Sequence, residues 1–450
     1  MTAQNRAQVD AREVPVSSCQ PESLDDYEVA LEQFQSYFGD PTETLAGTLE
    51  RDPEFVIGHI FNASAMLMMS ERQYLPTVRD SIEAAEALAH KSTDREKGLL
   101  AAARHWMEGR WDLACVTWDQ VLADHPRDAM AIQLAHLTDF YLGDAVNLRD
   151  RIGRVIGNWD EDTPGYSFIL GMQAFGLEEC NQFDRAEAAA RGALAIEARD
   201  PWSVHALAHV LEMQNRYEEG QQFMRGSVDN WAPGNGFAFH NWWHLALFHL
   251  EQEDYRGALQ LYDDQILPDD SEVSLQMLDA SALLWRIQLQ GVDVADRWQR
   301  IADLWARKTP AENGYYAFND MHAIIALVGA GRLAEAREIL ADLQQAAVSN
   351  PQLTRMMARD VGVPACEAMI AFAEERYAEA VASLHPIRGI ASRFGGSNAQ
   401  RDILSQTLIE SAIRAGQRGF AANLMSEREV HKPESPLTRC YREKIVQIAG

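Results

Sequence analysis

The chain has 450 residues, of which 47% are hydrophobic, and a formal net charge of -27. This length is too great for one ordinary hydrophobic core, so it predicts either several domains or a repeat architecture that grows in one dimension. The charge argues against nucleic acid and anionic membrane surfaces as partners, because the field of the whole chain repels phosphate groups.

The five cysteines are scattered along the chain, and none belongs to a Cys-x-x-Cys pair. This pattern indicates neither a disulfide framework nor a cysteine-ligated zinc site, and reduced thiols in the cytosol are the simplest interpretation. The N-terminal segment lacks an apolar signal core, and no apolar run is long enough to cross a membrane. We therefore expect a cytoplasmic protein that does not associate with a membrane.

Residues 1–24 are polar and aperiodic, and they include Pro15 and Pro21. They predict an N-terminal arm that lies on the surface. From residue 25 to residue 450 the apolar residues follow helical periodicity, and alternating strand patterns are nearly absent. The sequence thus predicts one all-α domain over residues 25–450.

A short phrase recurs along this domain: a polar turn, then an aromatic or aliphatic marker, then Ala or Gly three positions later. Weaker phrases at Asn147 and Val292 divide the longest intervals, which brings the period a little above the roughly 34 residues of a tetratricopeptide repeat. Each unit is expected to be two antiparallel helices, with the marker at the start of the second. About ten such hairpins would stack into an α-solenoid, open or closed around a central groove. The clear markers are Trp111, Phe183, Tyr217, Tyr255, Leu333 and Tyr377.

Four successive first helices carry an ionisable residue at nearly the same distance before their markers. His205, His244, Asp279 and His322 lie 11 to 13 positions before Tyr217, Tyr255, Val292 and Leu333. If the units stack, these groups meet on the inner surface of the solenoid. The register therefore predicts a polar site in the middle of the chain.

Histidines at helical spacing indicate metal binding at this site. His205 and His209 lie four residues apart, with Glu212 three further on, and His240 and His244 form a second pair. Two imidazoles one helical turn apart can ligate one metal ion, and zinc, iron or manganese suits these donors. We take the four histidines as metal ligands and Glu212 as a catalytic carboxylate. A polar pocket without metal and purely structural histidines remain open.

Asp279 stands alone in an apolar run, so its carboxylate needs a partner such as an imidazole across the groove. We take Asp279 and His322 as catalytic groups, and a structural pair is the alternative for Asp279. Asp320, in the turn before His322, either caps the helix or contacts ligand. His249 points to another face than His244 and is expected to be structural.

Three further residues are predicted to line the pocket. Trp202 and Trp243 flank the histidines and would form its walls, although buried tryptophans are commonly packing anchors. Arg401 follows a Gly-Gly-Ser turn, Gly395 to Ser397, whose backbone N–H groups can hold an anion. A plain helix cap is the alternative for that turn.

Several of these blocks resemble the tetratricopeptide repeat protein 38 family, which includes the StaR-like proteins of glycopeptide-antibiotic gene clusters. The resemblance implies a tetratricopeptide fold and, through the antibiotic-cluster members, an oxygenase-like role. It spans nearly the whole chain. The matching blocks are Trp202–Met213, His240–His244, Asp279–Ser281 with Leu284–Arg286, Asn319–Ala323, and Gly395–Ser397 with Ala399–Asp402.

The sequence therefore predicts a His- and carboxylate-lined pocket that binds a small molecule. A metal-dependent enzyme, oxygenase- or hydrolase-like, is one form of this hypothesis. The alternative is a non-catalytic adaptor that binds a peptide or protein in the groove, as repeat solenoids commonly do. The His and acidic character of the groove favours the pocket over the adaptor, and a homodimer remains open.

Overall fold

The computed structural model describes residues 8–17, 20–432 and 435–448. Apart from one short hairpin, the regular elements of this described part are helices, which confirms the predicted all-α class. None of these helices is both long enough and apolar enough to cross a bilayer.

The contacts within the chain define two compact units. Unit 1 comprises Met1–Leu207, Asp229–Ala238 and Pro351–Leu353, and unit 2 comprises Ala208–Val228, Phe239–Asn350 and Thr354–Gly450. The boundary falls inside or at the end of a few helices, which are α11 (Pro201–Met213), α13 (Val228–Trp231), α14 (Ala238–Glu251) and α20 (Gln352–Met357).

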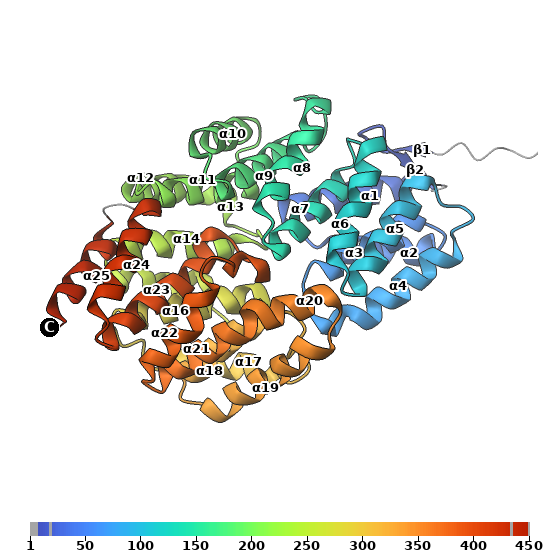
Figure 1. Ribbon diagram of the computed structural model, residues 1–450. Helices are drawn as coiled ribbons and strands as arrows, with labels where there is room; N and C mark the ends of the chain where they lie inside the picture. The colour runs from blue at the N-terminus through green and yellow to red at the C-terminus, as the bar shows by residue number, and fades with distance from the viewer. Residues whose placement is uncertain (1–7, 18–19, 433–434, 449–450) are drawn as a thin grey trace, which may run out of the picture. The chain divides into compact units, whose positions relative to one another are not determined.

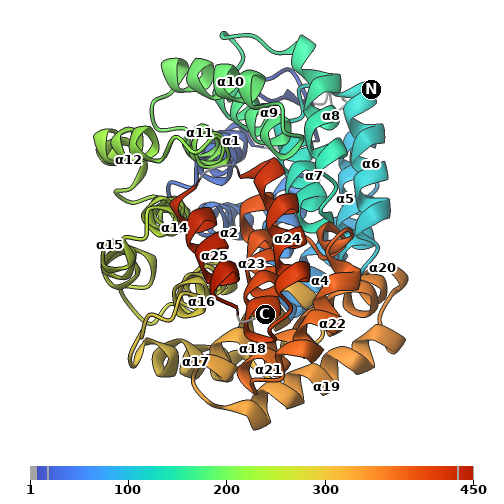
Figure 2. The ribbon, with the colours of Figure 1, turned by 60° about the vertical axis from the view of Figure 1, so that its left-hand side comes forward.

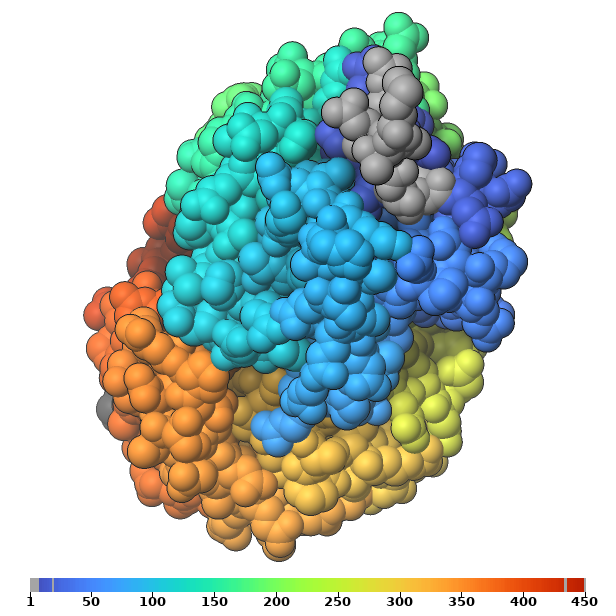
Figure 3. Space-filling model, turned by 90° about the vertical axis from the view of Figure 1, so that its right-hand side faces the viewer, coloured from blue at the N-terminus to red at the C-terminus, as the bar shows by residue number. Residues whose placement is uncertain are grey.

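Unit 1 is built from consecutive antiparallel helices that run from blue to green in Figure 1. Figure 3 shows the blue and cyan residues of its first helices as one continuous surface. Its elements are β1 (Gln8–Val9), β2 (Pro15–Val16), α1 (Pro21–Ser36), α2 (Pro41–Arg51), α3 (Val56–Leu67), η1 (Arg72–Tyr74), α4 (Leu75–Ala87), α5 (Asp94–Met107), α6 (Trp111–Asp124), α7 (Ala129–Leu142), α8 (Ala145–Val155), η2 (Ile156–Asn158), α9 (Tyr166–Glu179) and α10 (Phe183–Ile196).

The described residues of the predicted N-terminal arm form a short hairpin. The described residues 8–17 contain an antiparallel hairpin in which Val9 pairs with Pro15, and Val14 and Val16 are buried. Ser17 donates from its backbone N and its Oγ to Glu96, at 3.0 and 2.9 Å. Apolar burial and these hydrogen bonds attach the segment to unit 1, and α1 already begins at Pro21.

Unit 2 contains the remaining repeats. In Figures 1 and 2 its red C-terminal helices lie beside α16, and the contacts place α23 directly against α16. Its elements are α12 (Tyr217–Gly226), α15 (Tyr255–Leu261), η3 (Tyr262–Ile266), α16 (Ser274–Leu289), α17 (Arg297–Lys308), α18 (Ala317–Gly329), α19 (Leu333–Ser349), η4 (Ala358–Gly362), α21 (Val363–Ala373), α22 (Tyr377–Ile387), η5 (Ala391–Phe394), α23 (Asn398–Arg414), α24 (Arg418–His431) and α25 (Pro436–Gln447), with α14 at its edge.

The repeat markers begin second helices as predicted. Each of the six clear markers is the first residue of its helix, and the residue two positions earlier has a positive φ. A left-handed residue just after a helix lets the chain reverse in a tight turn. The aromatic marker then packs on the preceding helix, and the rings of Trp106 and Trp111 stack with centroids 4.3 Å apart.

The weak marker Val292 is an exception. The second helix of that unit, α17, begins only at Arg297, and the left-handed residue before it is Ala295. The chain therefore makes a longer connection between α16 and α17 than the repeat phrase predicted.

Candidate functional site

The candidate site lies in unit 2, on α14 and α16, and both helices are apolar along most of their length. Apolar helices are buried in a solenoid, so the few polar residues in them are buried as well. His240 and His244 lie one turn apart on α14, and Asp279 lies on α16. Their exposed fractions are 4%, 0% and 0%.

His240 and Asp279 form the closest polar contact in this group. His240 Nδ1 lies 2.6 Å from Asp279 Oδ2, which fits donation of the Nδ1–H to the carboxylate. Burial raises the pKa of Asp279, and the neighbouring His240 acts in the opposite direction. The contact confirms the expected imidazole partner for this carboxylate. It orients His240 so that Nε2 is the nitrogen available for chemistry.

Two further histidine rings neighbour each other here. The ring of His244 lies 4.9 Å from that of His240 and 4.3 Å from that of His209, measured between centroids. Glu212 Oε2 lies 3.7 Å from His244 Nδ1. Burial lowers the pKa of His244 well below its usual value, and the two neighbouring imidazoles lower it further. His244 is therefore neutral at physiological pH, as a metal ligand or a base requires.

Trp243 connects the histidines to an arginine. Its ring stacks with His240 at 5.4 Å and an interplanar angle of 14°, and the Arg286 guanidinium lies over it at 5.3 Å. The indole N–H of Trp243 is buried and has no hydrogen-bond partner among the described residues. A buried orphan donor is uncommon in a native interior and indicates a place where a polar ligand group fits.

A network of buried charges lies next to these rings. Lys432, directly after α24, extends its ammonium to Glu212 at 2.5 Å and to Glu251 at 3.1 Å. Burial alone would lower the pKa of Lys432, but the two carboxylates raise it above its usual value. Lys432 is therefore charged, and its ammonium holds the two acidic side chains together.

A second ion pair closes the network on the side of α23. Arg428 contacts both carboxylate oxygens of Asp402, and Gln406 donates to Asp402 Oδ2 at 2.8 Å. Burial acts to raise the pKa of Asp402, but Arg428 and Lys432 hold it well below its usual value. Asp402 is therefore ionised and fully engaged by these partners.

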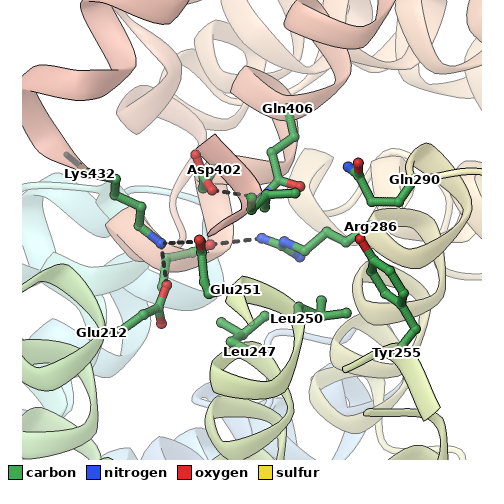
Figure 4. Close-up of a pocket in the computed structure, with 12 residues that line it drawn as sticks. Glu212, Leu247, Leu250, Glu251, Tyr255, Arg286, Gln290, Asp402, Gln406 and Lys432 are labelled. Carbon is green, nitrogen blue, oxygen red and sulfur yellow. Dashed lines mark hydrogen bonds and ion pairs between the residues drawn. The ribbon is translucent and has the colours of Figure 1, made fainter. Parts of the chain in front are cut away.

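These groups surround a small pocket, shown in Figure 4. Arg286 and Lys432 reach into it from opposite sides. The volume of the pocket that water can occupy is about 10 Å³, so the pocket holds about one water molecule. Its lining residues come from α11, α14, α15, α16, α23, α25 and the segment after α24; they are Glu212, Leu247, Leu250, Glu251, Tyr255, Arg286, Gln290, Ala399, Asp402, Gln406, Lys432 and Leu437.

Arg286 differs from Lys432 and Arg428, the other two cations of this network. It makes three hydrogen bonds, all to main-chain carbonyls: Nη1 to Ala282, and Nη2 to Ala399 and Gln400. No carboxylate within the described residues forms an ion pair with it. Burial lowers its pKa, and the nearest acids only partly offset this effect. Arg286 is thus a buried cation without a counter-ion in direct contact.

The other predicted groups of unit 2 lie further along the wall. His322, on α18, is buried, and its Nδ1 lies 2.8 Å from the carbonyl of Phe318. This contact places the proton on Nδ1 and leaves Nε2 as an acceptor without a partner in the described chain. Burial lowers the pKa of His322 to about 4. Asp320 accepts from the backbone N of Gly314, which fixes the preceding loop.

Arg401 and the Gly-Gly-Ser turn form a helix start. Ser397 caps α23, and its side chain and that of Gln400 form a capping box. The Arg401 guanidinium contacts the carbonyl of Gly396 and, at 2.8 Å, Asn398 Oδ1. These contacts are local, and they fit the plain cap. A ligand-binding role for Arg401 stays a prediction.

Trp202 and His205 belong to unit 1. Asp200 caps α11 as predicted, accepting from the backbone N of Trp202 at 3.0 Å. The indole of Trp202 donates to the carbonyl of Gln35 at 2.9 Å, and the ring of His205 packs against Phe175 at 4.9 Å. Both side chains are buried. Their assignments as pocket wall and metal ligand stay predictions.

His249 is structural, as expected. Its Nδ1 contacts Asp254 at 2.7 Å and its Nε2 contacts Arg225 at 3.0 Å, so both ring nitrogens are used in joining helices. It lies on α14 with His240 and His244 but takes no part in their cluster. This makes it a matched control for experiments on those two histidines.

Sequence reasoning missed most of the charged pocket. Lys432, Arg428 and Glu251 were not singled out, because nothing in local spacing connects them to α14. Arg286 had a usable signal: it is the basic residue of an apolar helix and lies seven positions after Asp279. Two helical turns place both residues on the same face of α16.

No protein-family model matches the chain. Among solved structures it is similar to a human IFIT1 dimer with m7Gppp-AAAA, at 13% sequence identity and a TM-score of 0.43, over 97% of this chain and 96% of that chain. A human IFIT1 dimer with PPP-AAAA is 14% identical over 94% of this chain and 99% of that chain, at a TM-score of 0.42. Similarity at this level does not bear on what this chain binds, so the prediction that it binds no nucleic acid gains no support. The helical hairpins fit a tetratricopeptide-like family, while the tetratricopeptide repeat protein 38 family remains a resemblance drawn from sequence.

Proposed function

We propose that unit 2 binds a small polar molecule in its interior, and that His240, oriented by Asp279, is the group that acts on it. The 2.6 Å contact between these side chains carries the proposal. A carboxylate that fixes one nitrogen of a buried imidazole prepares the other for proton transfer or metal ligation. The orphan N–H of Trp243, whose ring stacks on His240, supplies a donor for such a ligand.

A divalent transition metal is the cofactor that these donors suit. His240 and His244 each have a carboxylate oxygen near Nδ1, from Asp279 at 2.6 Å and from Glu212 at 3.7 Å. Carboxylates on the far nitrogens of metal-ligating histidines are a common arrangement. Zinc, iron and manganese all fit His and carboxylate donors. A metal bound here would polarise a ligand oxygen or lower the pKa of a bound water.

The adaptor alternative has less support. In unit 2 the helix α23 packs against α16, and Arg286 of α16 bonds to backbone carbonyls at the start of α23. A peptide that bound along α16 would have to displace this helix. A closed interior lined by charged and imidazole groups instead favours a small ligand.

Metal binding tests the proposal directly. We expect protein purified without chelator to carry zinc, iron or manganese by elemental analysis, and the apo protein to bind one of these ions in calorimetric titration. His240→Gln should weaken binding at least tenfold. His249→Gln, on the same helix, should bind like the wild type, because the ring nitrogens of His249 contact Asp254 and Arg225.

Two results would count against it. If the protein carries no metal and responds to none of the three ions, the metal-binding form of the proposal is wrong. Native mass spectrometry then decides whether an organic molecule is bound in its place. If neither a metal nor an organic molecule is found, and His240→Gln behaves like His249→Gln in every measurement, the site has no binding function.

A further inference from the structure

Arg286 indicates the chemical class of the ligand. Its guanidinium is buried in the pocket and makes three hydrogen bonds, all to carbonyl oxygens. A guanidinium has five N–H groups. The Nε–H and one Nη1–H therefore have no partner within the described residues. Buried arginines are ordinarily paired with a carboxylate or phosphate, because an unpaired charge in the interior is costly.

The acidic side chains near Arg286 are already engaged by other groups. Glu212 and Glu251 bind Lys432, Asp402 binds Arg428, and Asp279 binds His240. None of these carboxylates lies within ion-pair distance of Arg286. The protein thus supplies a counter-ion to each cation of this network except one, and that one faces a pocket (Figure 4).

We infer that Arg286 binds the carboxylate group of a small organic acid, which is the ligand of the neighbouring His240–Asp279 centre. A carboxylate is favoured over a phosphate because Glu212, Glu251 and Asp402 line the same pocket and repel a doubly charged anion. The pocket holds about one water molecule, so even one carboxylate end group enters only if side chains of the lining move. The link to His240 rests on the proposed function.

The distance between the two centres limits the size of the acid. Asp279 and Arg286 are seven residues apart on α16, which is about 10 Å along the helix. The ring of Trp243 lies between them, since it contacts both His240 and Arg286. An acid that contacts both Arg286 and His240 must therefore pass beside the Trp243 ring and be long enough to span this separation.

Small carboxylates test the inference on the whole protein. Acetate and formate, at constant ionic strength, should raise the melting temperature of the wild type in a saturable manner, while chloride and inorganic phosphate should not. Arg286→Lys keeps the positive charge but loses the planar fork. It should abolish the acetate response. Arg414→Lys is the matched control, because Arg414 also stacks on a ring, that of Phe372, but is paired with Glu410.

A crossed design separates this inference from the proposed function. His240→Gln should lose the metal response and keep the acetate response, whereas Arg286→Lys should lose only the acetate response. An acetate response without any metal or His240 effect would support the carboxylate site and refute the proposed function. An acetate shift that persists in Arg286→Lys, or that chloride or phosphate matches, overturns the inference.

A second measurement holds even if Arg286→Lys fails to fold. Acetate bound at Arg286 should show an intermolecular nuclear Overhauser effect between its methyl group and the indole of Trp243 in the wild-type protein. The signal should disappear in excess formate. Saturating acetate without this effect would also overturn the inference.

Discussion

His240 on α14 and Asp279 on α16 form a 2.6 Å hydrogen bond between side chains of two neighbouring repeats. The bond joins residues 39 positions apart in the sequence. Both side chains are buried, so water cannot supply a hydrogen bond if the imidazole proton is on the wrong nitrogen. The state of one carboxylate therefore determines which nitrogen of His240 is available to a metal or a substrate.

The Asp279→Asn variant tests whether Asp279 determines the tautomer of His240. The amide can donate to Nδ1, which moves the imidazole proton to Nε2 and blocks that nitrogen as a ligand or base. We expect metal affinity to fall by about 10- to 100-fold while the fold is retained, because Asn has nearly the same shape. Titration calorimetry gives the affinity, and long-range proton–nitrogen spectra of histidine-labelled protein give the tautomer. An unchanged tautomer would show that Asp279 only packs against His240.

Lys432 is predicted to stabilise unit 2 by neutralising Glu212 and Glu251. Removing one partner of a buried ion pair leaves a charge without compensation, so Lys432→Met should cost about 3 kcal/mol or more in unfolding free energy. Adding Glu212→Gln and Glu251→Gln to the Lys432→Met variant should restore much of the lost unfolding free energy. Guanidinium denaturation measures both effects. Arg376→Met, which breaks an exposed pair with Glu379, should change little.

The repeat architecture was predictable because each hairpin repeats the same local physics. An aromatic marker such as Trp111 or Tyr377 packs on the helix before it, and a left-handed residue two positions earlier makes the turn. Val292 failed as a marker because its unit turns at Ala295 instead. The two units were not predicted, since the repeat pattern continues through α11, where one boundary falls.

The candidate site was predicted in part, and the same irregular turn explains the main difference. Counting back from Val292 paired Asp279 with His244, but α17 begins at Arg297. Counted from the ends of their own helices, Asp279 lies 10 positions before Leu289 and His240 lies 11 before Glu251, so His240 is at the matching height. The role of Lys432 could not be predicted, because Lys432 contacts Glu212 at a separation of 220 positions in the sequence. Such contacts depend on how the last helices fold back.

His322 predicts a loss of stability in mild acid. Its pKa is about 4 in the folded protein against a usual 6.5, so the unfolded chain binds the proton first. The contribution of neutral His322 to the free energy of unfolding is complete above pH 6.5. It falls by about 3 kcal/mol as the pH is lowered toward 4. His322→Asn keeps a donor near the Phe318 carbonyl but cannot titrate. The variant should therefore lose less stability than the wild type over this range.

The measurement is the unfolding midpoint at several pH values between 7.5 and 4.5, for wild type and variant in parallel. His244 and His136 also have lowered pKa values and contribute to the slope of both proteins, so the difference between the curves isolates His322. Curves that remain parallel would show that the pKa of His322 is the same in the folded and the unfolded protein.

Close helix packing in unit 1 depends on Gly176. A Cβ at this position of α9 would lie 2.5 Å from the carbonyl oxygen of Leu148 and 2.6 Å from Cα of Arg149, both backbone atoms of α8. Backbone cannot move aside as a side chain can, so Gly176→Ala should force the helices apart and cost about 2 kcal/mol.

Gly192, within α10, has nothing within 4 Å of the same added atom. Gly192→Ala should instead stabilise by about 0.5–1 kcal/mol, because alanine is the better helix former. Thermal and chemical unfolding of the two variants should therefore shift in opposite directions from the wild type, and equal shifts would mean that α8 and α9 do not pack this closely.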